Sequence, residues 1–235
     1  MADLINTANQ TSVNYNYSDI SDGFGLETYY LFARIEASGT GTETTTYHIS
    51  KDAVASEVIV LQLSWGATST CGDALTAETQ ATKVSFTSPA MAQPKVINGT
   101  AVIDFCYANY DTHGAPSGSR FYPLVEIYHV TSGGTETQLG STWYGRKAES
   151  TGSTLTINRA VAYINCGRKQ FQRGEFLRIK LGGANCGLSG VTTAGTTAIG
   201  IDPANRDGEA LITPSTDDPV STTIFKVRVP FEADI

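Results

Sequence analysis

The chain has 235 residues, with 16 Lys and Arg against 23 Asp and Glu and a formal net charge of −7 at pH 7. This acidic balance argues against nucleic acid as the main partner, because phosphate backbones are bound by strongly basic surfaces. The longest clean apolar run, 58–61, is far shorter than the ~20 residues that a membrane-spanning helix needs. The sequence predicts neither a nucleic-acid-binding nor a membrane protein.

Residues 1–22 form an N-terminal arm that is rich in Asn, Thr, Ser and Tyr. It has neither the basic segment nor the apolar segment of a secretion signal, which predicts that the protein is made in a cytoplasm. Val13, Tyr15 and Tyr17 alternate with asparagines, as in a strand. Two interpretations stay open: a strand added to the sheet edge of another subunit, or the first strand of the same domain. The candidate partner-binding residues of the arm are Leu4, Ile5, Val13, Tyr15 and Tyr17.

Residues 23–235 are expected to form a single domain. Thr, Val, Ile, Tyr and Phe dominate, and windows with helical periodicity are nearly missing. The sequence therefore predicts an all-β fold, an antiparallel β-sandwich of jelly-roll-like character with long loops. Strands are predicted at 28–37, 44–50, 57–65, 82–87, 95–107, 121–131, 135–144, 153–164, 175–181 and 223–232.

Several stretches carry more specific signals. The segments 29–44 and 121–137 share an aromatic strand, a Gly-rich turn and a Thr-Glu-Thr return, which is typical of a hairpin.

The stretch 158–165 alternates poorly, so a helical turn is an alternative there. Regular structure is not expected in 183–220. Pro230 lacks an N–H, which predicts a sheet edge or a bulge at the end of the last strand.

Bases gather in the middle of the chain, where 112–181 holds 4 acids and 9 bases. Arg168, Lys169 and Arg173 are the candidate docking residues of this region, because separated charges suit docking between proteins. The alternative is that they are only the solvated sides of strands.

Cys71, Cys106, Cys166 and Cys186 do not have the spacing of a zinc site or of a redox dithiol. Buried thiols are expected in a reducing compartment, with disulfides as the alternative. The three histidines lack partners at metal-ligand spacing, and His129 is expected to be a partly exposed strand residue.

Common nucleotide-binding and hydrolase motifs are missing, so neither a cofactor nor catalysis is predicted.

Asp202, Asn205 and Asp207 resemble a calcium loop, although the EF-hand spacing fails. The alternative is a turn capped by Asp and Asn side chains, with Arg206 pairing an acid. A pair of distant carboxylates for sugar hydrolysis stays open as a further alternative. Tyr and Trp side chains in loops or near strand ends are expected to lie in the core or at an interface. The alternative is that they stack on the faces of sugars.

The segments 1–20, 171–179, 202–208 and 229–235 resemble tailed-phage virion proteins from aquatic samples, in the same order along the chain. The resemblance implies a structural role on the virion head, as a decoration protein on the major capsid protein lattice, with neighbouring copies in contact. From it we expect a viral structural protein that is not an enzyme. The alternative is a tail or fibre-associated protein that recognises host glycans.

Overall fold

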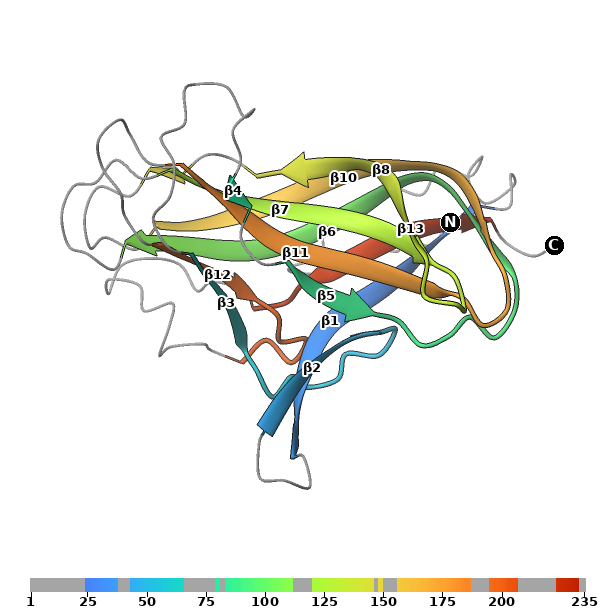
Figure 1. Ribbon diagram of the computed structural model, residues 1–235, viewed down its shortest axis with the longest axis horizontal. Coiled ribbons are helices and arrows are strands. Elements are labelled where there is room, and N and C mark those ends of the chain that lie inside the picture. Colours follow the sequence, from blue (N-terminus) through green and yellow to red (C-terminus); the bar gives the residue numbers. More distant parts are fainter. Residues whose placement is uncertain are drawn as a thin grey trace, which may run out of the picture.

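Two layers of β-strands face each other across one hydrophobic core (Figure 1). The computed structural model describes residues 24–37, 43–65, 79–80, 83–111, 120–145, 148–149, 156–186, 195–206 and 223–232. All regular elements in these ranges are strands, which confirms the predicted all-β fold. Within them, no helix is long and apolar enough to cross a membrane.

The first layer contains seven strands, whose neighbours are antiparallel. In spatial order they are β3 (Val60–Trp65), β12 (Gly195–Gly200), β6 (Lys95–Asp111), β13 (Lys226–Glu232), β1 (Phe24–Ala37) and β2 (Glu43–Ser50). The seventh, β10 (Thr156–Phe171), pairs with β6 from Lys95 to Asn109. Because β6 also pairs with β12 and β13, β10 lies along its other side and forms an edge of the layer.

The second layer is built on four strands: β5 (Val84–Thr87), β11 (Phe176–Cys186), β7 (Arg120–Val130) and β8 (Glu136–Tyr144). The short β4 (Thr79–Gln80) pairs with β11, and β9 (Ala148–Glu149) pairs with β7. A single parallel bridge between His48 and Thr87 connects β2 to β5. The backbone ladder is therefore continuous from one layer to the other.

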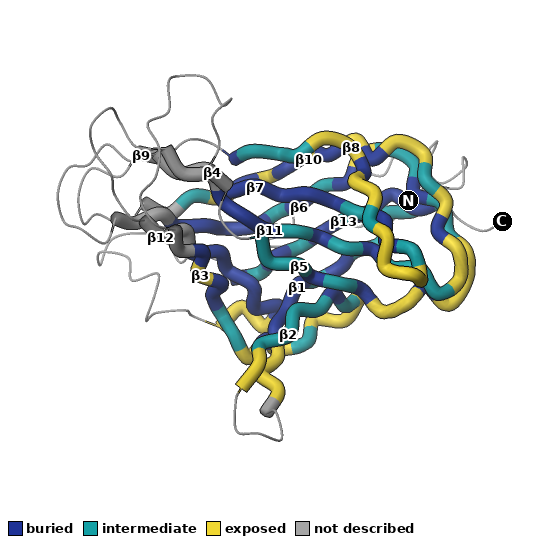
Figure 2. Tube along the Cα trace, viewed as in Figure 1, coloured by how far each residue is buried: buried dark blue, intermediate teal, exposed yellow. Residues whose placement is uncertain are grey.

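Aromatic side chains fill the space between the layers. Phe105 of β6 stacks on Phe225 at 4.7 Å between ring centroids and meets Trp143 of β8 edge-on at 6.0 Å. Phe171 of β10 approaches His129 of β7 at 4.8 Å. Burial of each large apolar side chain stabilises the fold by about 1.5–3 kcal/mol. Figure 2 shows the central strands as the most buried part of the described chain.

The layers also meet where β8 approaches β10. Gly140 has a φ of 70°, and a Cβ built on it would lie 2.3 Å from the backbone oxygen of Asn165. The same Cβ would lie 2.9 Å from Cγ2 of Ile164. Only glycine combines this φ with so close an approach of two backbones.

Two sequence predictions are confirmed in detail. Both hairpins form, because β1 pairs with β2 and β7 pairs with β8 in antiparallel register. Near Pro230, the register between β13 and β6 shifts between Arg228 and Phe231, as expected for a bulge.

One open alternative is decided and one expectation is corrected. The stretch 158–165 is part of β10, in agreement with the strand predicted at 153–164, and is not a helical turn, because Ala160, Ala162 and Ile164 are buried while the residues between them face outward. The stretch 183–220 does contain regular structure: β11 extends to Cys186 and β12 spans Gly195–Gly200. In β12 the backbone pairs with strands on both sides, so the ladder stabilises a segment of small residues that lacks a strong strand pattern.

Cys106 and Cys166 lie on β6 and β10, and both side chains are buried. The thiol of Cys166 lies 3.5 Å from the carbonyl oxygen of Ile164. Burial raises the pKa of Cys166 to about 11. The side chains of Cys71 and Cys186 are outside the described residues, so the expectation of four thiols stays a prediction.

At pH 8, iodoacetamide should alkylate Cys166 about 100-fold more slowly in the folded protein than in urea, because its thiolate is scarce and shielded. Mass spectrometry of the Cys166 peptide over time measures both rates. Equal rates would show that β10 opens readily and that the thiol is not protected.

Candidate functional site

The outward sides of the two layers differ in how their charges are arranged. The outward side of β5, β11, β7 and β8 is here called the paired face. It is defined by Glu126 and Glu136, the cations Lys83, Arg178 and Lys180, and the polar side chains Tyr128 and Thr142. Every one of these charged groups has an opposite charge in contact.

Glu126 is the centre of the paired face, with a side chain only 4% exposed. Its carboxylate accepts hydrogen bonds from Lys83 at 2.7 Å, Thr142 at 2.9 Å and Tyr128 at 3.0 Å. Burial alone would raise the pKa of Glu126, but these donors outweigh it and hold the pKa below its usual value. Burial and the hydrogen bond to Glu126 raise the pKa of Tyr128 to about 12.

The cations of β11 are held by the neighbouring strand β8. Arg178 and Lys180 both donate to the carboxylate of Glu136. Lys180 also lies 4.4 Å from the centroid of the Tyr128 ring, a cation–π geometry. The network satisfies its own charges, so this face offers little to a charged partner.

The outward side of β10, β6 and β13 is here called the open face, defined by Val102, Asp104, Arg159, Val161, Tyr163, Arg168, Lys226 and Arg228. Strand register sets these side chains in rows across the layer. Tyr163 faces Val102, which faces Arg228, and Val161 faces Asp104, which faces Lys226. Tyr163 is 66% exposed and Val161 is 38% exposed. Large apolar groups therefore lie in solvent beside two cations.

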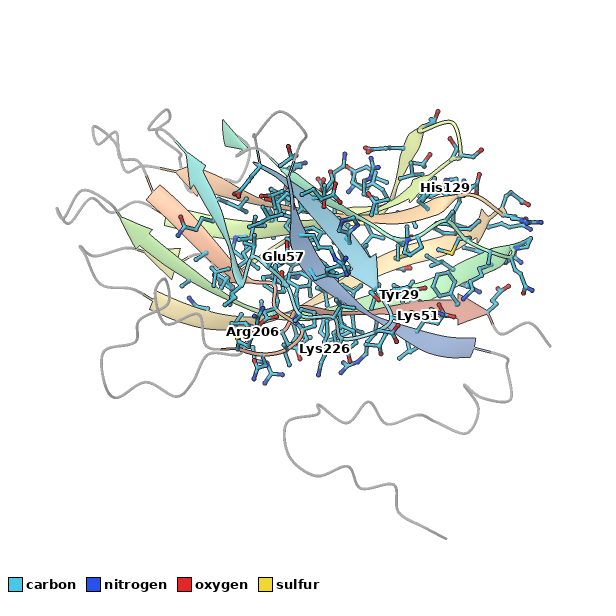
Figure 3. All side chains as sticks on the ribbon, turned by 90° about the horizontal axis from the view of Figure 1, so that it is seen from below. Tyr29, Lys51, Glu57, His129, Arg206 and Lys226 are labelled. Atoms are coloured by element: carbon cyan, nitrogen blue, oxygen red, sulfur yellow. The ribbon has the colours of Figure 1, made fainter. Side chains whose placement is uncertain are left out.

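Only part of the charge on the open face is neutralised. Arg159 donates two hydrogen bonds to Asp104, at 2.9 and 2.7 Å. Arg168 reaches Glu232 at 3.3 Å. Lys226 and Arg228 form no ion pair with any described residue. The face thus carries two uncompensated positive charges in a protein of net charge −7. Figure 3 shows Lys226 on the outer side of the first layer, whereas His129 belongs to β7 of the second layer.

The predicted docking residues do not form one patch. Arg168 lies on the open face, and the exposed Arg173 lies in the turn between β10 and β11. Lys169 pairs in register with the buried Ile97, so it lies on the core side of the strand end and is half-buried. The arm residues Leu4, Ile5, Val13, Tyr15 and Tyr17 are outside the described residues.

The most exposed residues of the open face were missed from the sequence. The signal was present, because Val161 and Tyr163 alternate with two alanines and Ile164. An alternation in which the inward side chains are small gives little contrast in hydrophobicity, so the strand predicted at 153–164 did not indicate which of its side chains face solvent. Lys226 and Arg228 alternate with valines in the strand predicted at 223–232, but their place on one face with Tyr163 depends on pairing between distant strands.

The candidate calcium loop is a structural turn around Asp202. The Asp202 side chain is 0% exposed and accepts backbone hydrogen bonds from Ser56 at 3.0 Å and Ala204 at 3.2 Å. Arg206 adds its backbone N–H at 3.1 Å and its guanidinium at 2.8 Å. Asn205, at a φ of 52°, accepts from the backbone of Thr223 at 3.0 Å. The oxygens that calcium would need are occupied by protein donors.

No group of metal-ligating side chains occurs among the described residues, and Asp207 is outside them. Burial alone would raise the pKa of Asp202, but the hydrogen bonds from Arg206 and the backbone hold it below its usual value. The alternative of a capped turn therefore describes this segment.

His129 is buried rather than partly exposed, with a relative exposure of 3%. Its ring packs edge-on against Phe171, and its Nε2 lies 2.6 Å from Glu175. The correction has a physical reason: β10 and its turn cover this part of β7, which a single-strand pattern does not reveal.

No family model and no curated protein sequence matches the chain. A selenomethionine-labelled α-amino acid ester hydrolase shares the fold, at 12% identity and a TM-score of 0.50, over 88% of this chain and 36% of the hydrolase. An aminopeptidase from the marine sediment archaeon Thaumarchaeota archaeon matches at 8% identity and a TM-score of 0.47, over 87% and 37% of the two chains. Infectious bursal disease virus, Gx strain, matches at 11% identity and a TM-score of 0.26, over 83% and 40%.

The hydrolase match shows a shared fold, and the two matches with lower scores add nothing to it. This chain spans little more than a third of the hydrolase, at 36%. The comparison corrects the prediction that the chain is not an enzyme. That prediction depended on missing motifs, but the structure of a hydrolase contains the same fold, so missing motifs do not exclude an enzyme.

Proposed function

We propose that this protein is a structural component of a virus particle, located on the major capsid protein lattice of a tailed-phage head. In this proposal its open face is the surface that docks onto neighbouring proteins. The observation that carries it is the contrast between the two outer faces: one satisfies its own charges, and the other exposes Tyr163 on the same face as Lys226 and Arg228, which form no ion pair with any described residue. The resemblance of the chain ends to phage virion proteins supports the location.

The chemistry of the open face suits a protein partner. Burial of an exposed aromatic side chain gains about 1.5–3 kcal/mol, and aromatic residues are enriched in the centres of interfaces. The two cations favour an acidic partner and add specificity and association rate. The exposed Arg173 in the β10–β11 turn is a second candidate contact with the shell.

Full-length protein should bind purified heads that lack it, and the variant Tyr163→Ser with Lys226→Ala and Arg228→Ala should bind at least tenfold more weakly. The loss is expected because the variant removes the apolar anchor and both uncompensated charges. Co-sedimentation with heads over a range of protein concentrations measures the affinity.

A matched control is Thr135→Ala with Thr137→Ala, which truncates two exposed side chains of the second layer. This control should bind like the natural sequence. Equal binding by the open-face variant, with an unchanged melting temperature, would contradict the proposal.

A further inference from the structure

A second surface of the chain has the opposite character to the open face. The hairpin end, defined as Ile35, Glu43 and Glu57, lies where β1 and β2 project from the body of the molecule (Figure 1). Ile35 is 42% exposed, both glutamates are exposed, and Glu43, opposite Ala37 in the register, lies on the same side of the hairpin as Ile35. Glu57 accepts a hydrogen bond from the backbone N–H of Ile35, which holds it beside that side chain. Figure 2 shows this region as exposed.

The glutamates of the hairpin end form no ion pair with any described residue. Arg34 precedes Ile35 in β1, so it points to the other side of the strand, where it lies over the Phe32 ring at 5.8 Å. Arg206 donates to the carbonyl oxygen of Ser56, next to Glu57, but its charge is paired with Asp202. The hairpin end is therefore acidic around an exposed apolar side chain. The open face is basic around two exposed apolar side chains.

These surfaces contain all three of the large hydrophobic residues that are exposed in the described part of the chain: Ile35, Val161 and Tyr163. Charge and apolar surface are complementary between them. We propose that the hairpin end of one copy docks onto the open face of a second copy, with Ile35 against Tyr163 and Val161 and the glutamates facing Lys226 and Arg228. This inference rests on the proposed function only in taking the open face as a docking surface.

The two surfaces of one copy cannot meet each other. Lys226 pairs in register with Tyr30 of β1, five residues before Ile35. At ~3.3 Å per residue, the extended strand keeps these positions ~17 Å apart. Contact between two open faces is also unfavourable, because it would bring like charges together. The remaining arrangement is head-to-tail, which forms either a closed ring or an open filament.

Charge exchange tests this arrangement with the full chain. The variant Lys226→Glu with Arg228→Glu makes the open face acidic, and Glu43→Lys with Glu57→Lys makes the hairpin end basic. Each variant alone should associate with itself at least tenfold more weakly than the natural sequence, because like charges then meet. Sedimentation velocity over a range of concentrations measures the self-association.

A chain that carries all four exchanges should recover self-association, because opposite charges meet again in exchanged positions. Contact between two open faces predicts no recovery, so this variant separates the two arrangements. It also guards against misfolding, because a variant that has merely lost its fold is not rescued by further substitutions. Self-association should weaken as salt rises, since screening shortens the range of surface charges.

The inference is wrong if the natural sequence stays monomeric at low salt, or if the four exchanges fail to restore association. Loss of head binding by the open-face variant, together with a natural sequence that stays monomeric at low salt, would keep the proposed function and reject the inference. Self-association of the natural sequence without head binding would keep the inference and reject the proposed function.

Discussion

Replacing Gly140 by alanine should lower the free energy of unfolding by about 2–4 kcal/mol. A φ of 70° disfavours any side chain, at a cost of about 1 kcal/mol, and the new Cβ would lie 2.3 Å from the backbone oxygen of Asn165. Backbone cannot move aside as a flexible side chain does, so β8 and β10 must separate, which adds about 1–3 kcal/mol. Denaturant unfolding followed by fluorescence measures the difference.

Gly134→Ala is the matched control for Gly140→Ala. Gly134 has a φ of 86°, but no atom lies within 4 Å of a Cβ built there. The free energy of unfolding of this variant should fall only by the cost of the unfavourable backbone conformation, about 1 kcal/mol. Equal losses in the two variants would show that the approach of β8 to β10 does not constrain the fold.

Asp202→Ala should destabilise the protein by about 1–3 kcal/mol, as expected when buried hydrogen-bonding groups lose their partner. The substitution leaves the backbone N–H groups of Ser56, Ala204 and Arg206 without their acceptor. Arg206→Ala is the control and should cost less, because it leaves those three backbone bonds in place. Denaturant unfolding measures both. A larger loss in the Arg206 variant would contradict the central role of the carboxylate.

The contribution of Asp202 should depend on pH in a defined direction. Its folded pKa lies below the ordinary value of 3.8, so the folded state favours the charged form. The stabilisation is therefore complete above a pH of about 4 and is lost as the pH falls through the folded pKa. The stability difference between the natural sequence and Asp202→Asn should narrow below pH 4. A constant difference would contradict this mechanism.

Strands with strong alternation could be predicted from the sequence. In β13, Val227 and Val229 point to the core and Lys226 and Arg228 point outward, as expected. Hydrophobic contrast between neighbouring residues is a local property, so it is visible without knowledge of the fold.

A strand stabilised mainly by its neighbours, such as β12, could not be predicted, because both of its sides pair with other strands. For β10 the sequence predicted a strand at 153–164 but left a helical turn open at 158–165, because the inward side chains include two small alanines. In each case the backbone ladder and the layer above it decide the structure. Neither is encoded in the local pattern.

The candidate site depends even more on long-range pairing. Tyr163 and Arg228 lie in one row only because β10 and β13 flank β6. The same holds for Asp202, whose carboxylate is buried by a segment from the first quarter of the chain that contains Ser56. Single-strand periodicity predicts the face of a residue, but not its neighbours across a sheet.

The pairing of β1 with β13 has a consequence for synthesis. Tyr30 pairs with Lys226, roughly 200 residues later in the chain. At about 5–20 residues per second, a ribosome needs about 10–40 s to make that interval. During this time β1 has an unsatisfied edge, where a chain on the same polysome can exchange strands. Lys226 and Arg228 arrive with β13, so the open face forms only after synthesis has passed this strand. The proposed head-to-tail contact is thereby restricted to copies that have been translated almost to Glu232.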